Sequence, residues 1–170
     1  MATFGSWPTP ITSELVVRAA AGLGGVSLHG DTVTWAEQRP EEGGRTQLVQ
    51  RTGEGPAVDV LPAGVNARTA AHEYGGGAWW VAENTVWFAD WADQRLYTTT
   101  GAAAPEPVTP EPEVPRGDRW ADGRVTTDGR WALVVREHHP VGGGPAEVVN
   151  ESVVLDATGQ RASRGLVSGP

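Results

Sequence analysis

The sequence predicts an all-β fold of about three four-stranded antiparallel sheets, preceded by a short helix. The chain has 23 glycines and 13 prolines among its 170 residues, which predicts many turns and argues against a helical bundle. Between those turns, short segments alternate apolar and polar residues in the way that strands do. The same order of strands recurs three times along the chain, so we expect a fold that is built from repeats.

The stretch from His72 to Tyr97 contains four of the eight tryptophans and has the pattern of three successive strands. Glu83-Asn84 supplies the turn between the first two strands, because asparagine tolerates a positive φ. Apolar residues point to both faces, which requires a sheet that is covered on both sides. We expect one face to carry Trp80, Ala82, Val86 and Phe88, and the other to carry Trp79, Val81, Trp87 and Ala89.

Three copies of a hairpin align on their turns at Asp31, Asn84 and Gly129, which lie 53 and 45 residues apart. Four strands in a period of about 40 to 50 residues are typical of the blades of a β-propeller. The predicted blades cover about 26–62, 75–110 and 121–169 of a partial propeller at 26–170. Two unrelated β-meanders with ordinary strand chemistry would give a similar pattern, and this alternative stays open.

Residues 1–25 form the predicted lead-in and helix. The helix is expected at Ile11–Ala21, with Thr12 or Ser13 as its N-cap and Gly22 as its stop. The N-terminus lacks the basic start and apolar run of a signal peptide, and no segment approaches the ~20 apolar residues of a membrane span. We therefore expect a cytoplasmic protein.

The charge of the chain argues against polyanionic partners. Its 13 basic residues, all of them arginine, are outnumbered by 21 acidic residues, and the net charge is −8. Nucleic acids and anionic membranes are bound through clustered positive charge, so neither is an expected partner. The chain has no cysteine, which excludes disulfides, zinc–thiolate sites and a thiol nucleophile.

The sequence predicts no catalytic residue, metal or cofactor in this chain. None of its six serines stands in the G-x-S-x-G turn that exposes a hydrolase nucleophile. The segment at His72 is not an H-E-x-x-H zinc motif, because Gly76 stands where the second histidine would be. Neighbouring side chains on a strand point to opposite faces, so His138 and His139 are not expected to share one metal. The Gly75–Gly77 run lacks the Lys-Ser/Thr of a phosphate loop, and we expect it to let an inner strand approach its neighbours closely.

The tryptophans are predicted to pack between sheets rather than to stack on carbohydrate, because most of them fall in strand patterns. Trp91 stands in the turn before Asp93 and is the one expected to be most exposed. The aspartates near it form no D-x-[DN]-x-[DN]-G calcium loop.

Several segments of the chain resemble one known family. They are FGSWPTPIT at Phe4–Thr12, RTAAHEYGGGAWW at Arg68–Trp80, FADWADQRLY at Phe88–Tyr97, TPEPEVPRGDRWAD at Thr109–Asp122, and VNESVVLD at Val149–Asp156. Together they resemble the N-terminal β-propeller of bacterial serine peptidases of the prolyl oligopeptidase family, in the branch of dipeptidyl aminopeptidases and acylaminoacyl peptidases. The resemblance extends over nearly the whole chain.

The resemblance implies a role for the chain in a larger enzyme. In this family a propeller, usually of seven blades, covers a C-terminal α/β-hydrolase domain that carries a Ser-Asp-His triad. The propeller admits only peptides of limited size. The present sequence contains neither the remaining blades nor the hydrolase domain, so no triad is carried over and the chain alone is expected to be noncatalytic. Its expected partners are that hydrolase domain and peptides.

If the glycine run lets an inner strand lie at the crowded axis of a propeller, the residues before the run lie near the central channel, and this gives a hypothesis for a site. We expect Arg68, His72, Glu73 and Tyr74 to line the central channel or to face the hydrolase domain, where Glu73 meets the amino terminus of a peptide. In the alternative interpretation, Glu73 pairs with an arginine and Tyr74 caps a strand by hydrogen bonding.

Two other functions remain open for a chain of this kind. One is a freestanding propeller-derived module for interaction or oligomerisation, and the other is a small hydrolase of lactonase type, which needs a ring of calcium-binding acids. Three blades leave their end sheets without neighbours, so a fragment should associate with itself through its exposed ends. An evolved module should instead have polar end faces.

Overall fold

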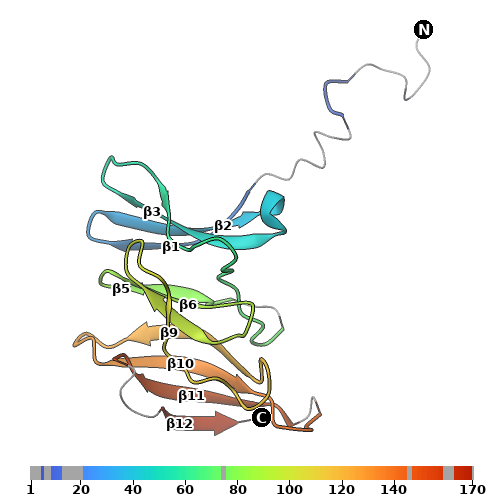
Figure 1. Cartoon of the computed structure of the whole chain (residues 1–170), viewed down its shortest axis with the longest axis vertical. Helices are drawn as coiled ribbons and strands as arrows, with labels where there is room; N and C mark the ends of the chain where they lie inside the picture. The colour runs from blue at the N-terminus through green and yellow to red at the C-terminus, as the bar shows by residue number, and fades with distance from the viewer. Residues whose placement is uncertain are drawn as a thin grey trace.

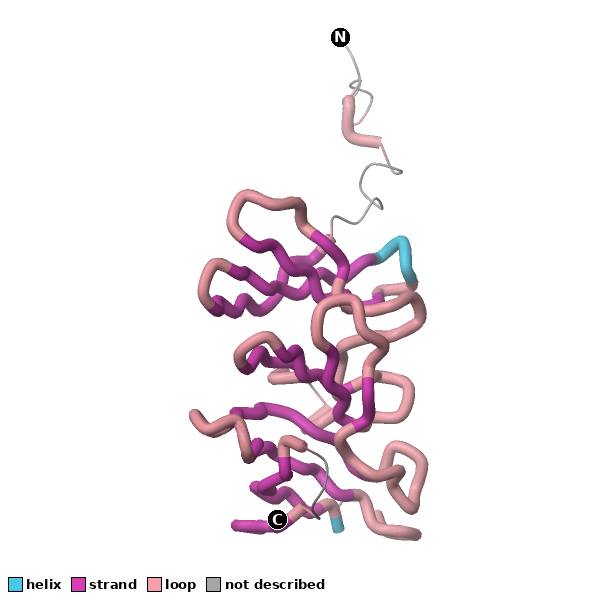
Figure 2. Tube along the Cα trace, turned by 60° about the vertical axis from the view of Figure 1, so that its left-hand side comes forward, coloured by secondary structure: helices cyan, strands magenta, loops and turns pink. Residues whose placement is uncertain are grey.

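Three four-stranded antiparallel sheets, stacked one on another, make up the fold in the computed structural model (Figure 1). The structure describes residues 5, 9–12, 21–73, 76–144, 147–158 and 163–169. Each sheet follows the chain order of its strands, and the strands are joined by turns and loops (Figure 2). The all-β prediction and the three four-stranded sheets are therefore confirmed.

The strand bounds follow the predicted hairpins closely. The first sheet contains β1 (Gly22–His29), β2 (Thr32–Arg39), β3 (Arg45–Thr52) and β4 (Val58–Asp59), with a 3-10 turn, η1 (Pro40–Glu42), between β2 and β3. The second contains β5 (Trp79–Ala82), β6 (Thr85–Ala89), β7 (Leu96–Thr99) and β8 (Glu106–Pro107). The third contains β9 (Asp118–Val125), β10 (Trp131–His138), β11 (Val149–Asp156) and β12 (Arg164–Gly169). The three first hairpins turn at Gly30-Asp31, at Glu83-Asn84 and in the loop 126–130, as predicted.

The predicted helix at Ile11–Ala21 lies mostly outside the described residues. Ile11 and Thr12 are exposed and are not part of a helix. Within the described ranges the chain has the 3-10 turn η1, a 3-10 position at Glu147 and no α-helix, so the structure gives no support to an N-terminal helix. No helix among those residues is long and apolar enough to cross a membrane.

The predicted assignment of faces in the second sheet was wrong. The two-residue turn pairs Ala82 with Thr85 and Trp80 with Trp87, and residues that are paired across two strands point to the same face. One face of β5 and β6 therefore carries Trp80, Ala82, Trp87 and Ala89, and the other carries Trp79, Val81, Val86 and Phe88. The error arose because the prediction continued the alternation of faces along the chain through the turn. A two-residue turn places the residue before it and the residue after it on the same face, so every later residue changes face.

Two apolar cores fill the spaces between the sheets. Between the second and third sheets, Trp80 and Trp87 stack at 5.8 Å and pack with Trp120 and other buried residues of the third sheet. Between the first and second sheets, Phe88 and Val86 are fully buried with Ala36, Leu48 and their neighbours. The prediction that tryptophans pack between sheets is confirmed for Trp80, Trp87 and Trp120.

Strands β1, β5 and β9 form one edge of the stack, and their close approach depends on small residues. A left-handed residue stands at or just before this edge in each sheet: Gly25 (φ 56°), Gly77 (φ 56°) and Asp122 (φ 54°). The amide of Asp122 donates to the carbonyl of Gly77 at 2.9 Å, and a Cβ on Gly77 would lie 1.9 Å from the Asp122 carboxylate. This contact bears out the expected role of the glycine run at Gly77.

The two outer faces of the stack are apolar and exposed. On the first sheet, Val26 and Leu28 are 69% and 73% exposed, and they pair with Trp35 and Val33 on the same face. On the third sheet, the outer face carries Leu133, Val135, Val154 and Val167, and Val167 is 70% exposed. When the first hairpins of the two sheets are aligned on their turns, Val33 and Trp35 of the first sheet match Val86 and Phe88 of the second. Val86 and Phe88 are completely buried against the first sheet. The outer faces therefore have the composition of the faces that lie between sheets.

Candidate functional site

The loops that connect one sheet to the next lie, together with two loops within the second and third sheets, at one side of the stack, which we call the loop face. It is formed by residues 60–73 and 76–78 between β4 and β5, 90–95 between β6 and β7, 108–117 between β8 and β9, and 139–144 after β10. Hydrogen bonds join these loops: Trp91 donates to Asn66, and His139 donates to Gly117. The turns of the three first hairpins lie at the opposite side (Figure 1).

Three of the four predicted site residues are exposed on the loop face, and Tyr74 lies outside the described residues. His72 and Glu73 are consecutive and both left-handed, with φ of 54° and 60°. Residues other than glycine rarely adopt this conformation, and it costs free energy that the surrounding structure must supply. The backbone at His72 and Glu73 is thus held in a strained shape by its contacts.

Those contacts come from two directions. The backbone amide of His72 donates to the carboxylate of Glu137 at 2.6 Å, and His72 Nε2 lies 2.8 Å from Asn150 Oδ1. From the other direction, the buried side chain of Gln94 accepts a hydrogen bond from the amide of Ala70 at 2.6 Å. The loop is therefore fixed to the second sheet through Gln94 and to the third through Glu137.

Glu137 is the centre of a polar cluster that sequence reasoning missed. Its side chain is nearly buried, and it accepts hydrogen bonds from Arg119 Nη1 at 2.8 Å and from the amide of His72, while His139 Nε2 lies 2.7 Å from it. Burial alone would raise the pKa of the Glu137 carboxyl, but the contacts with His139, His72 and Arg119 outweigh it and lower this pKa. Glu137 therefore stays ionised and can hold all three partners.

The two adjacent histidines have different partners, as their strand position predicts. His138, the last residue of β10, lies 2.6 Å through Nδ1 from the carboxylate of Asp118, whereas His139 contacts Glu137. Among the described residues, no group of three or more histidines and acids is arranged to hold a metal ion. Nor does any serine of the described part bond to the His138–Asp118 pair, so these two residues do not form a triad there.

Arg68 and Trp91 form the second feature of the loop face. The guanidinium of Arg68 lies 4.4 Å from the centroid of the Trp91 ring, and that of Arg116 lies 4.5 Å from it. Trp91, the tryptophan predicted to be most exposed, is half-exposed, and these two side chains lie over its ring. Arg116 was not among the predicted site residues, and nothing in its local sequence distinguishes it.

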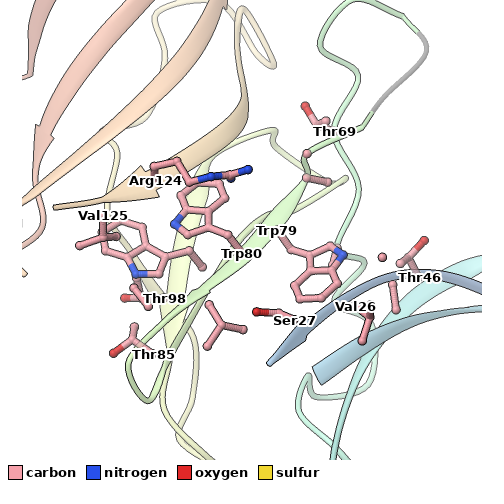
Figure 3. A pocket seen from close by; sticks show the side chains of 18 of the residues that line it. Val26, Ser27, Thr46, Thr69, Trp79, Trp80, Thr85, Thr98, Arg124 and Val125 are labelled. Carbon is pink, nitrogen blue, oxygen red and sulfur yellow. The ribbon is translucent and has the colours of Figure 1, made fainter. Parts of the chain in front are cut away.

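A groove of about 1280 Å³ runs along the edge of β1, β5 and β9. Trp79 points toward Val26, Ser27 and Thr46 of the first sheet, and Trp80 lies beside Arg124 and Val125 of the third (Figure 3). Arg68 lines this groove, whereas the groove lining does not include His72 or Glu73. The structure thus brings Arg68 to the groove and directs the His72–Glu73 segment toward the third sheet.

Comparison with solved structures relates this arrangement to known proteins. The chain is 36% identical to a Mycobacterium tuberculosis puromycin-hydrolyzing peptidase, with a TM-score of 0.84 and with 97% of this chain and 27% of that chain covered. The chain resembles part of a puromycin-hydrolyzing peptidase. Puromycin hydrolase and its serine-to-alanine mutant complexed with PGG are each 32% identical over the same shares, with TM-scores of 0.83 and 0.82.

The chain spans about a quarter of the length of these matched proteins. A scan against protein-family models and a search of curated proteins gave no match. The likeness to hydrolytic peptidases supports the predicted resemblance in its coarser form, which is a propeller-like all-β portion of a peptidase.

Proposed function

We propose that this chain is a noncatalytic propeller portion of a serine peptidase of the prolyl oligopeptidase family. In the whole protein, the three sheets stand beside an α/β-hydrolase domain and limit the size of the peptides that reach it. The observation that carries the proposal is the 36% identity over 97% of this chain to 27% of a puromycin-hydrolyzing peptidase. The finer assignment, to dipeptidyl aminopeptidases or acylaminoacyl peptidases, rests on the sequence segments given above.

The two exposed apolar faces favour this proposal over a freestanding interaction module. Leu28 on the first sheet and Val167 on the third are 73% and 70% exposed. Apolar surfaces of this kind are normally covered in a soluble protein, and further sheets of the same type would cover them in a complete propeller. A module that had evolved to stand alone would carry polar residues at these positions.

In the proposed enzyme, the loop face carries the residues that meet the hydrolase domain and the substrate. Arg68, His72, Glu73 and Tyr74 are assigned to this interface. Support comes from the strained backbone at His72 and Glu73, since strain of this kind concentrates at functional sites. Glu73 is exposed, and within the described part of the chain its carboxylate has no bonded partner. It is therefore free to accept the amino group of a peptide.

The first test is the mass of the native protein in lysate of the source cells, detected with an antibody raised against this chain. A band several times larger than 17.9 kDa, together with puromycin hydrolysis by the purified large form, is the expected result. A band at 17.9 kDa alone would overturn the proposal and would favour the freestanding module.

The role of Glu73 is tested in the full-length protein. Glu73→Gln removes the charge and keeps the shape, so we expect it to weaken the preference for peptides with a free amino terminus over acetylated ones. Glu54→Gln, an exposed residue in the turn between β3 and β4, is the matched control and should leave that preference unchanged. An unchanged preference in Glu73→Gln would remove Glu73 from the site.

A further inference from the structure

Two separate segments of the chain place arginine side chains on one indole ring, which belongs to a third segment. Arg68 comes from the loop between the first two sheets, Trp91 from the turn between β6 and β7, and Arg116 from the loop between β8 and β9. The guanidinium carbons lie 4.4 and 4.5 Å from the ring centroid, within the range of a cation–π interaction. Two like charges held against the same ring repel each other, so this arrangement is not explained by the stability of the fold alone.

Backbone hydrogen bonds hold the main chain in place at each segment of the cluster. The amide of Arg68 donates to Ala89 at 3.0 Å, and the amide of Trp91 donates to Asn66 at 2.9 Å. Arg116 is left-handed at φ 59° and precedes Gly117, whose amide closes a turn on Val114 at 2.7 Å. Because the backbone is held and each guanidinium already lies over the ring, the guanidinium groups lose less freedom when they bind a ligand.

Neither guanidinium has an acidic partner within the described residues. Six other arginines of the described part bond to carboxylates or carbonyls, namely Arg39, Arg45, Arg95, Arg119, Arg124 and Arg136. The two acids next to Trp91 are engaged elsewhere: Asp90 accepts from the amide of Asn66, and Asp93 accepts from Tyr97 and from the amide of Arg95. Arg68 and Arg116 are thus two unneutralised charges held against one ring, in a chain where acids outnumber arginines by 21 to 13.

We propose that Arg68 and Arg116 bind two carboxylates of an extended acidic protein segment. Because the two guanidinium carbons lie 4.4 and 4.5 Å from the same ring centroid, they are at most roughly 9 Å apart. Acidic residues at positions i and i+2 of an extended chain point to the same side roughly 7 Å apart, which places one carboxylate at each guanidinium. The bidentate geometry of guanidinium and carboxylate then fixes the segment in place.

The charge of the whole molecule favours a short acidic segment over a polyanion. A net charge of −8 repels the continuous phosphate backbone of a nucleic acid, which needs many cationic contacts. Two carboxylates on a protein segment need only the two guanidiniums. Since Arg68 also lines the groove along β1, β5 and β9, the segment would lie at the mouth of that groove. The site shares Arg68 with the proposed interface, but its test uses this chain alone, so a failure of the test would not count against the peptidase role.

The test is fluorescence anisotropy of a labelled peptide with alternating glutamate and glycine, titrated with the 170-residue chain. A peptide with glutamine in place of each glutamate has the same length and backbone. We expect the glutamate peptide to bind and the glutamine peptide to bind at least about tenfold more weakly, because the charge-assisted bonds are lost. Arg68→Gln and Arg116→Gln should each weaken the glutamate peptide by a similar factor.

The matched control is Arg51→Gln, which removes the same charge from an exposed position at the end of β3. It should change the affinity less than about twofold, since a distant exposed charge is screened by salt. Equal loss in Arg51→Gln would mean nonspecific charge attraction and would overturn the proposal. So would equal binding of the two peptides, no binding of either, or tighter binding of a single-stranded oligonucleotide than of the glutamate peptide.

Discussion

Glu137 shows how one side chain can determine the shape of a distant loop. It lies near the end of β10, yet it accepts a hydrogen bond from the amide of His72, which is 65 positions earlier in the sequence. The same carboxylate contacts Arg119 and His139. Removing its charge would leave three polar groups with a weaker acceptor in a nearly buried site.

We expect Glu137→Gln to lower the free energy of unfolding by roughly 1–3 kcal/mol at neutral pH. The pKa of Glu137 is lowered in the folded protein, so its contribution is present above the unfolded value of about 4.3 and is lost as the pH falls through the lower folded value. Urea unfolding at several pH values should therefore show the difference between the two proteins shrinking below about pH 4. The exposed Glu54→Gln serves as control, and a difference that stays constant down to pH 3 would contradict the assignment.

Gly123 is a residue at which the second and third sheets tolerate little additional volume. A Cβ built there would lie 2.0 Å from the ring of Trp80, which is rigidly stacked on Trp87. Gly123→Ala should therefore lower the midpoint of thermal unfolding, with a loss of roughly 1–3 kcal/mol or more from overpacking. Gly165→Ala is the control, because a Cβ at that position in β12 meets open space. Equal midpoints for the two variants would show that the ring moves aside easily.

The residues of the site differ in how far the sequence reveals them. His72 and Glu73 belong to a motif, and a glycine run after them marks a special backbone, so both were predicted. Glu137 and Arg116 carry no such mark, because their roles arise from contacts with segments far along the chain. Sequence alternation assigns a residue to a face, but it does not identify its partner on another sheet.

At the scale of an element, the loop 66–73 acts as a strap between the second and third sheets. Gln94 is fully buried and left-handed at φ 67°, and its side-chain oxygen accepts from Ala70 while its amide group donates to the carbonyl of Trp91. The buried side-chain amide of Gln94 thus satisfies backbone groups of the loops that would otherwise need hydrogen bonds from water. The shape of the loop thus depends on a residue outside it.

Gln94→Leu keeps the volume of the side chain but removes its polar atoms. We expect a loss of roughly 1–3 kcal/mol in the free energy of unfolding, because the amide of Ala70 is left without a partner. Hydrogen exchange should show faster exchange at Ala70, with β10 unchanged. Gln38→Leu, at an exposed position of β2, should leave both properties near those of the parent protein. Protection at Ala70 that survives Gln94→Leu would refute the anchoring role.

The strands themselves were largely predictable, but which face of the sheet each residue of a strand occupies was not. Turn residues and alternation located all three first hairpins, since both signals are local. The facing of β5 and β6 was predicted wrongly because it depends on the number of residues in the turn, and a change of one residue reverses it. The short strands β4 and β8 have only two residues each, which leaves too little pattern to define their bounds.

At the scale of the whole molecule, the two apolar outer faces have the strongest consequence. We expect the isolated chain to associate in a concentration-dependent way in sedimentation velocity, because those faces have the composition of a buried interface. Leu28→Asp on the first sheet and Val167→Asp on the third should each reduce association.

The control for this prediction is Val141→Asp, which changes an equally exposed valine on a loop. It should leave the association unchanged. A chain that stays monomeric at every concentration, or a Val141→Asp variant that dissociates as fully as the other two, would show that the outer faces are not adhesive.

The number of sheets was predictable because the same pattern of strands and turns occurs three times in the sequence. How closely the sheets stack was less so: the contact of Gly77 with Asp122 was expected only in general terms, and the closeness of Gly123 to Trp80 was not predicted at all. Such contacts depend on the exact distance between neighbouring strands, which a single sequence does not encode in any local signal.

Stacking also determines how cooperatively the molecule should unfold. Each sheet contacts only the sheets next to it, so its stability is the sum of its own contribution and the coupling to its neighbours, as in a linear chain of interacting units. The middle sheet, β5–β8, has two such couplings, whereas each end sheet has one. Fraying should therefore begin at the ends, and the amide hydrogens of Val86 and Phe88 should be among the last to exchange, even though their strand is shorter than β10 or β11.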